Sequence, residues 1–446
     1  MELCAPWEKA FKKLYTPFEH FLHAQTTTGL MLVAMTLIAL VVANSPLYDA
    51  YKELIDTTIE LRIGDLVIKH SLHHWINDGL MAVFFFLIGL EIKREILVGE
   101  LSNIKVAILP ILAALGGMIA PALIYLSINY SGEGANGWGI PMATDIAFAI
   151  SALILLGKRV SPALVTFLVA LAIVDDLGAV LVIALFYTAE IQMNYLLLAG
   201  SMFGLMMILN RFGIHAILPY FLLGAVMWFF MLESGVHATI AGVIGAFAIP
   251  SKPKIPPTDL TKHTKKLLDE FDNYPSATDM TMHEKQKAIL QNIKDRIDSV
   301  GSPAARLEQG LHLPVGLIVI PLFALANAGI HIDFSSIGDV IMQPVSFGII
   351  CGLFLGKLLG IFVVSYIAIK LKIAQLPQES SLSQIFGVAA LGGIGFTMSM
   401  FVADLAFSNN PELIFQAKVG ILTASFLSGV LGFIWLRFIA RSAADL

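Results

Sequence analysis

The chain has 446 residues, of which 57% are apolar and 14% charged, and its formal net charge is -5. Soluble proteins are usually about 45–50% apolar with about a quarter of their residues charged, so this composition excludes an ordinary soluble enzyme and a disordered chain. The net charge argues against nucleic acid as a partner. Two distant cysteines, Cys4 and Cys351, exclude a disulfide framework and a CxxC metal site. We therefore predict an all-α polytopic membrane protein, with residues 1–446 forming one membrane domain.

The amino end mixes charged and aromatic residues over its first two dozen positions. This pattern predicts an amphipathic helix on the cytoplasmic membrane surface, not a cleaved signal peptide. A helix needs about 20 mainly apolar residues to cross the bilayer, and the apolar segments that follow predict about 12 transmembrane helices. These segments begin near residues 27, 73, 106, 138, 162, 193, 216, 235, 314, 341, 383 and 413.

A β-hairpin is predicted between the first two spans, which occupy residues 25–105. Two alternating runs flank Gly64-Asp65, and such a pair is typical of a two-residue hairpin turn. We place the hairpin at residues 58–69, on the extracytoplasmic side. Its open strand edges suit pairing with a second copy of the chain, although a simple surface hairpin fits the pattern as well.

The remaining sequence divides into two halves around a polar insert. Lys and Arg concentrate in alternate connections, which places both termini in the cytoplasm. The insert is predicted to be a cytoplasmic linker that is partly helical from Thr281 to Val300. We expect a first core repeat at 106–190, scaffold spans at 193–250, the insert at 251–313, a ninth span at 314–332 and a second core repeat at 340–440.

Four charged residues fall in the middle of predicted spans: Asp145, Asp175, Asp176 and Lys357. Each costs about 2.5–3.5 kcal/mol at a helix centre, so charges there usually serve a function. Adjacent helical residues point about 100° apart, so one of Asp175 and Asp176 can pair with Lys357 while the other faces a water-filled cavity. A buried ion-pair network that only sets helix register is the less favoured alternative, because Leu or Ala would be cheaper there.

Two of the predicted helices are interrupted. Pro141 and Thr144 precede Asp145 in the fourth span, and the eleventh span contains Gly392, Gly393, Gly395 and Thr397. Each is the middle span of three in its half of the chain, which is typical of transporters built from inverted repeats. Glycines also occur at tight helix crossings, so either segment alone would be weak support.

Carboxylates beside opened backbone and Thr144 can bind either a monovalent cation or protons. If the two compete for the same oxygens, loading one expels the other, and the site exchanges them. Lys357 would pair with an acid when protons occupy the site and would be released when sodium binds.

In these features the chain resembles the NhaA-type bacterial Na+/H+ antiporters. The matching motifs run in family order from about residue 75 to the carboxyl end. They are Ile76–Phe85, Gly89–Glu95, Pro141–Ala149, Ala170–Ala179, Ser234–Thr239, Pro321–Gly329, Gly356-Lys357 and Gly393–Ser399.

The resemblance implies an electrogenic, pH-regulated exchanger of the bacterial inner membrane, which moves two protons per Na+ or Li+ and serves sodium extrusion and pH homeostasis. It implies that Asp176 is the main Na+ ligand, that Asp175 contributes to the site and pairs with Lys357, and that Asp145 with Thr144 balances the helix ends at a crossing of the two broken spans. It further implies a homodimer formed through the hairpin, with lipid as the surrounding partner and no cofactor.

The resemblance also implies a set of pH-regulation residues. They are Glu91, Glu95, His237, Glu308 and His312. Histidine titrates in the right range, whereas a lone His237 near a helix end is more often simply hydrogen-bonded, and Glu91 with Glu95 is ordinary helical patterning. Gln309 and Ala305 stand where better-known members carry histidine and lysine.

Three other classes were weighed. An intramembrane enzyme would need a complete motif, but Asp175-Asp176 lacks the DDxxD pattern and the glycine-rich segment lacks the aspartate of a Gly-x-Gly-Asp protease. A sodium-coupled solute symporter on a related plan fits less well, because a small carboxylate cage suits a bare cation. A channel is disfavoured because no repeated filter ring is evident.

Overall fold

A computed structural model describes residues 25–63, 66–188, 191–255, 257–274, 284–331 and 337–439. Over these ranges the chain is helical apart from one two-stranded sheet. Seven of the described helical stretches are long and apolar enough to cross a membrane, or nine if each of two sharply bent helix pairs counts as one span. The prediction of an all-helical, multi-pass membrane protein is confirmed. The predicted helix at the amino end lies outside the described residues.

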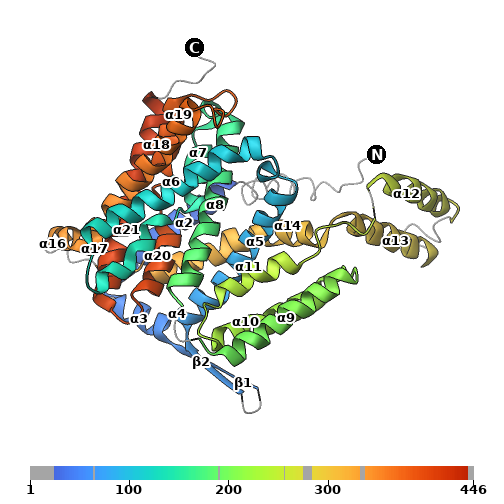
Figure 1. The fold of residues 1–446 in the computed structure, drawn as a ribbon. Coiled ribbons are helices and arrows are strands. Elements are labelled where there is room, and N and C mark those ends of the chain that lie inside the picture. Colours follow the sequence, from blue (N-terminus) through green and yellow to red (C-terminus); the bar gives the residue numbers. More distant parts are fainter. Residues whose placement is uncertain are drawn as a thin grey trace, which may run out of the picture.

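The elements follow one another along the chain with short 3-10 or π segments, labelled η, between several helices (Figure 1). The first part contains α2 (Gln25–Ala43), α3 (Tyr48–Asp56), β1 (Thr58–Ile63), β2 (Leu66–Ser71), α4 (Leu72–His74), η1 (Trp75–Leu80), α5 (Met81–Leu97), η2 (Glu100–Ser102) and α6 (Ile104–Ile128). The middle part contains η3 (Glu133–Met142), α7 (Ile146–Ile154), η4 (Gly157–Arg159), α8 (Pro162–Phe186), α9 (Met193–Arg211), α10 (Ile217–Glu233) and α11 (Thr239–Ala248). The last part contains α12 (Pro257–Asp272), α13 (Glu284–Val300), α14 (Pro303–Pro314), η5 (Val315–Val319), α15 (Ile320–Asn327), α16 (Ile337–Met342), α17 (Pro344–Ile350), η6 (Cys351–Gly356), α18 (Lys357–Lys370), α19 (Leu382–Leu391), α20 (Phe396–Ala406), α21 (Pro411–Ile434) and η7 (Trp435–Ile439).

Local signals explain where the functional helices begin. The Ser161 side chain accepts a hydrogen bond from the Leu164 amide, and Pro162 follows as the first residue of α8. The first residues of a helix have no intrahelical acceptor for their N–H groups, so a serine cap and a proline at the first position both suit this end. Ser381 and Gln384 form a reciprocal capping box at the start of α19.

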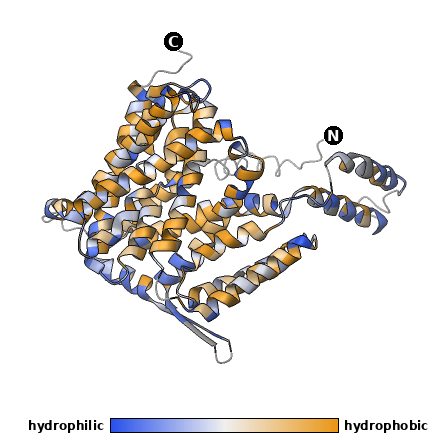
Figure 2. Cartoon of the chain, viewed as in Figure 1, coloured by the Kyte–Doolittle hydropathy of each residue, from blue (hydrophilic) through white to orange (hydrophobic). Residues whose placement is uncertain are grey.

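Much of the bundle consists of apolar residues, which are orange in Figure 2, including most of the α9–α10 pair. Leu197 on α9 is 66% exposed, and Phe221 on α10 is 69% exposed. An apolar face of this extent suits lipid as its solvent.

The predicted hairpin is present and projects from one end of the bundle (Figure 1). Strands β1 and β2 pair antiparallel, with Thr58 opposite Ser71 and Ile63 opposite Leu66. Its predicted turn, Gly64-Asp65, lies outside the described residues.

The insert contains more helix than the sequence analysis predicted. The expected helix near Thr281–Val300 is present as α13, although residues 281–283 lie outside the described part, and α12 was predicted as linker. The apolar spacing of Leu260, Leu267 and Phe271 along one helix face was the available signal for α12. The two helices project away from the bundle as a pair (Figure 1).

Both predicted interruptions are present. Helix α7 begins only after the 3-10 segment η3 and an extended stretch, and α19 and α20 are separated by a break with a 45° bend. These breaks position the candidate site.

Candidate functional site

The two interrupted helices meet directly at their breaks. The Asp145 amide donates to the Ile394 carbonyl over 2.7 Å, and the Thr144 hydroxyl donates to the Gly392 carbonyl over 2.9 Å. A helix end leaves carbonyls without intrahelical donors, and a buried carbonyl needs a partner. The first break therefore supplies hydrogen-bond donors to carbonyls at the second break, and these bonds hold the two segments together.

Small residues allow this approach. A Cβ atom added to Gly393 would lie 2.6 Å from the Leu353 carbonyl oxygen, and one added to Gly392 would lie 2.7 Å from the Ile361 side chain. Backbone cannot move aside as a flexible side chain can, so glycine is required at Gly393. The glycines of the break thus serve close packing as well as interruption.

Asp145 caps two helices at once. One carboxylate oxygen accepts from the Phe148 amide at the start of α7, at 3.0 Å. The other accepts from the Thr397 amide at 3.1 Å and from the Thr397 hydroxyl at 2.5 Å, at the start of α20. Helix amino ends favour negative charge because their amides are unpaired and the helix dipole is positive there. This carboxylate, which is 2% exposed, has a full set of donors.

Asp175 and Lys357 form a buried ion pair between α8 and the start of α18. Their closest atoms, Lys357 Nζ and Asp175 Oδ2, are 2.5 Å apart, and neither side chain is exposed. The Asp175 carboxylate is therefore paired with an ammonium group from a distant part of the sequence.

Asp176 is buried next to this pair and lacks a comparable partner. The residue is 1% exposed, and its Oδ1 atom has no hydrogen-bond partner. Asp175, Asp145 and Lys357 lie close enough for their charges to act on it. The sequence predicted that the second aspartate of the pair faces a water-filled cavity, but this side chain is closed off from solvent. A buried carboxylate with a free oxygen is stable only when it holds a proton or a cation.

The site therefore combines Asp145, whose oxygens have a full set of donors, with Asp175 and Asp176, each of which keeps one oxygen without a hydrogen-bond partner. A family model described as Na+/H+ antiporter 1 matches residues 19–436. The chain belongs to the NhaA family of Na+/H+ antiporters.

Curated relatives agree with this assignment over nearly their full lengths. The NhaA antiporter of Sulfurimonas denitrificans is 67% identical over 99% of this chain and 100% of its own length. NhaA 1 of Saccharophagus degradans is 47% identical over 97% of this chain and 93% of its own, and NhaA of Dichelobacter nodosus is 46% identical over 98% and 95%. Membership of this family makes the protein a transporter and excludes the enzyme, symporter and channel alternatives.

Four of the five expected regulatory residues of this NhaA antiporter gather around Arg94. Its guanidinium lies 2.8 Å from Glu95 and 2.9 Å from Glu308, and His312 lies 3.7 Å from Glu91. The sequence pattern had related Glu91 and Glu95 only as helical neighbours, whereas the fold adds α14 to them. The cluster thus joins α5 to the helix that follows the insert.

His237 lies apart from this cluster. Its ring nitrogen is 2.7 Å from the Tyr187 carbonyl oxygen, at the end of α8. The Tyr187 hydroxyl donates to the Asn136 carbonyl and accepts from the Gly139 amide. Beside these contacts lies a recess of about 300 Å³ that Asn136, Trp138 and Thr188 help to line. His237 therefore helps to join α8 to the segment before the first break.

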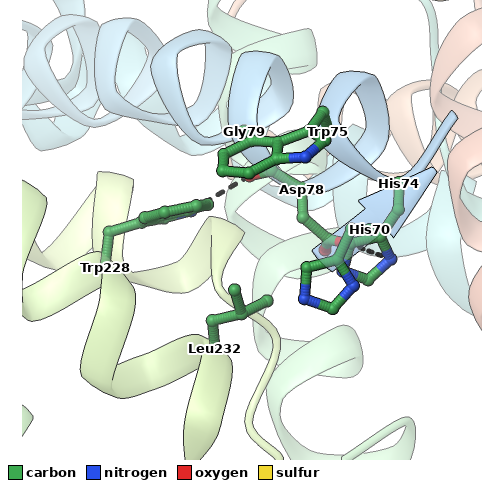
Figure 3. A pocket seen from close by; sticks show the side chains of 7 residues that line it. All are labelled: His70, His74, Trp75, Asp78, Gly79, Trp228 and Leu232. Carbon is green, nitrogen blue, oxygen red and sulfur yellow. Dashed lines mark hydrogen bonds and ion pairs between the residues drawn. The ribbon is translucent and has the colours of Figure 1, made fainter. Parts of the chain in front are cut away.

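A second histidine cluster lies at the foot of the hairpin (Figure 3). His74 is 3.2 Å from Asp78, His70 stacks on His74 with ring centroids 4.1 Å apart, and the Trp228 indole donates to the Asp78 carbonyl over 3.1 Å. Partial burial, and then the nearby His74, lower the pKa of His70. Within the described ranges, no group of three metal-ligating side chains is placed to hold a metal ion. This cluster was not predicted from the sequence, although the four-residue spacing of His74 and Asp78 was an available signal.

Proposed function

We propose that this antiporter exchanges intracellular Na+ or Li+ for external protons, with two protons per cation, at a site formed by Asp176, Asp175, Asp145, Thr144 and Lys357. The observation that carries the proposal is the unpartnered oxygen of Asp176 beside the Asp175–Lys357 pair. A hard monovalent cation is bound by oxygen atoms, and these carboxylates supply them.

A count of the charges in the site supports the ratio of two protons per cation. In the proton-loaded site, Asp176 is neutral and the charges of Asp175 and Lys357 cancel. Sodium then binds to Asp176 and Asp175, which releases the Asp176 proton. Lys357, deprived of its carboxylate partner in a dry site, releases a second proton. One cation therefore replaces two protons, so the exchange moves net charge and responds to membrane voltage.

Asp145 has a different role in this proposal. Its oxygens already accept three hydrogen bonds from the starts of α7 and α20. It holds the breaks together and fixes the ends of the helices that surround the cation. Pro141, Gly392, Gly393, Gly395 and Thr397 build the breaks themselves.

The architecture we propose has 12 spans, with inverted repeats at 106–190 and 340–440, the scaffold at 25–105, 193–250 and 314–332, and both termini in the cytoplasm of a bacterial inner membrane. The basic connections support this orientation, and the hairpin, which lies on the outer side, would join two copies of the chain. The cluster around Arg94 then lies on the cytoplasmic side, where Glu91, Glu95, Glu308 and His312, with His237 at the other side, would make exchange depend on pH.

The proposal is tested by purified protein in liposomes with an imposed pH gradient. Adding Na+ or Li+ should collapse the gradient, K+ should do so much less, and an imposed voltage should change the rate. Absence of any Na+ response between about pH 6 and 9, in folded protein, would overturn the proposal. An exchange rate that does not depend on voltage would overturn the ratio of two protons per cation.

A further inference from the structure

A buried polar network at the hairpin end of the molecule has no part in the proposed site. Asp404, near the end of α20, accepts a hydrogen bond from the Asn77 amide at 3.1 Å and lies 3.4 Å from Lys418 Nζ. Asn327 donates to Asn77 over 2.9 Å and lies 2.9 Å from a ring nitrogen of His73. The residues come from five elements, and Asp404 is the acid at their centre.

The network crosses a boundary between two parts of the chain. Asp404 and Lys418 belong to α20 and α21, within the second repeat of the proposed architecture. Asn77, His73 and Asn327 belong to α4, η1 and the end of α15, within its scaffold. The Asp404–Lys418 ion pair therefore lies on one side of the boundary. The Asn77–Asp404 hydrogen bond crosses it, and His73 Nε2 also approaches Asp404 Oδ2 across it, at 3.9 Å. Figure 1 shows the end of α20 near α4, in agreement with the contact between Asp404 and His73.

The network lies in line with the cation site along α20. Thr397, at the start of this helix, bonds Asp145, and Asp404 lies about two turns further on. Between them is Phe401, which is fully buried and contacts Phe85 of α5 and Phe323 of α15, with ring centroids 5.6 and 6.3 Å apart. An aromatic layer thus separates the site from the network, and it crosses the same boundary.

We propose that Asp404 is a positioning residue of the exchanger, which fastens the second repeat to the scaffold through Asn77 and so holds the outer side of the cation site closed. This rests on the proposed function, because the outer side is defined by the proposed orientation. For the site to open outward, α20 must part from η1 and α15, and the Asn77–Asp404 bond must break.

The exposure of the network suits a contact that breaks and re-forms. The side chains of Asp404 and Lys418 are 11% and 13% exposed, and that of His73 is 32% exposed. Water can therefore replace the Asn77 amide as Asp404 is released, while Lys418 stays with the carboxylate. A deeper ion pair, such as Asp175–Lys357, has no such replacement available.

Labelling of a buried cysteine from outside tests the proposal without measuring transport. Met81 lies one turn beyond Asn77 and one turn before Phe85, and it is 2% exposed. The reporter chain carries Met81→Cys, with Cys4 and Cys351 replaced by serine. A membrane-impermeant maleimide is added to the outside of vesicles that hold the protein in its native orientation.

Asp404→Ala and Asn77→Ala should each speed the labelling of Met81→Cys by roughly ten- to a hundredfold, the shift expected when one hydrogen bond to a charged group is lost. Both changes should raise the apparent KM for sodium on the inner side and leave kcat less affected, because fewer molecules present the site inward. Asp404→Asn retains an acceptor for Asn77 and should label more slowly than Asp404→Ala. Asp339→Ala removes an exposed acid of α16 and should change neither quantity.

Asp404→Ala leaves Lys418 without its partner and can fail to fold. Asn77→Ala keeps the Asp404–Lys418 pair and tests the same contact. Unchanged labelling in folded Asn77→Ala, or equal rates for Asp404→Ala and Asp404→Asn, would overturn the proposal. Failure of the unmodified chain to exchange sodium would instead overturn the proposed function, because labelling does not depend on transport.

Discussion

Asp145 and Asp176 are buried to the same degree but are surrounded very differently. Asp145 is 2% exposed and accepts hydrogen bonds from α7 and α20, whereas Asp176 is 1% exposed and keeps an oxygen without a donor. Burial alone therefore does not identify a binding group. The protein itself supplies the hydrogen-bond donors of Asp145, whereas Asp176 still needs a proton or a cation.

The largest expected effect comes from Asp176→Asn. A neutral amide cannot replace a buried carboxylate as a cation partner, and losing such a charge partner is worth about 3–5 kcal/mol, more than about 100-fold. Sodium-driven collapse of a pH gradient should be lost, while the protein remains folded in the membrane. Glu133→Gln is the control, since Glu133 is exposed. If Asp176→Asn exchanged sodium within a few-fold of the parent rate, Asp176 would not be the binding group that distinguishes it from Asp145.

Breaking the Asp175–Lys357 pair should reduce stability as well as exchange, and its effect on stability can be measured separately. Lys357→Met leaves a buried carboxylate without its partner, and this costs about 3–5 kcal/mol. The double variant Asp175→Asn/Lys357→Met removes both charges and should recover part of the loss. Thermal unfolding in detergent measures both. A double variant no more stable than the single one would show that the pair is not coupled.

A smaller effect should follow from Thr397→Val, which tests the structural role of Asp145. The change removes the hydroxyl that donates to Asp145 over 2.5 Å, and hydrogen bonds to charged groups contribute about 1.5–3 kcal/mol. The unfolding temperature should fall, with the preference for Na+ over K+ unchanged. Thr397→Ser keeps the hydroxyl and is the matched control; if it lost as much stability, the bond would not be the cause.

The smallest effect extends the comparison to the hairpin foot, where water reaches the charged groups. Partial burial and His74 lower the pKa of His70, so its NMR titration midpoint should lie below the ordinary value of about 6.5. Folding then opposes protonation, and stability is lost as the pH falls from about 6.5 through the lower folded pKa. His70→Gln assigns the signal. A midpoint at or above the ordinary value would contradict the described environment.

Much of the fold was predictable because the membrane restricts it. Mid-span charges and dense glycines stand out against apolar sequence, so the breaks and the charged residues of the crossing could be located before the structure. The hairpin followed from its alternating runs. Helix α12 was not predicted because charged residues separate its few apolar positions, so the helical spacing of those positions is weak.

Pairings between distant segments were harder to predict. Helix geometry alone allowed either Asp175 or Asp176 to meet Lys357. The family resemblance implied Asp175, and in the structure Lys357 pairs with Asp175. The network of Asp404 with Asn77 joins residues more than 300 positions apart. Asp404 was not among the residues predicted from the sequence, because an acid about two turns beyond a glycine-rich break does not reveal its distant partner.

Proton release on sodium binding tests most directly whether one set of oxygens serves both ions. Calorimetric titration of the purified antiporter with Na+, in buffers of different ionisation enthalpy, counts the protons that each bound cation displaces. The account predicts about two protons per Na+, with no binding heat for Asp176→Asn. Sodium binding that releases no protons would contradict it.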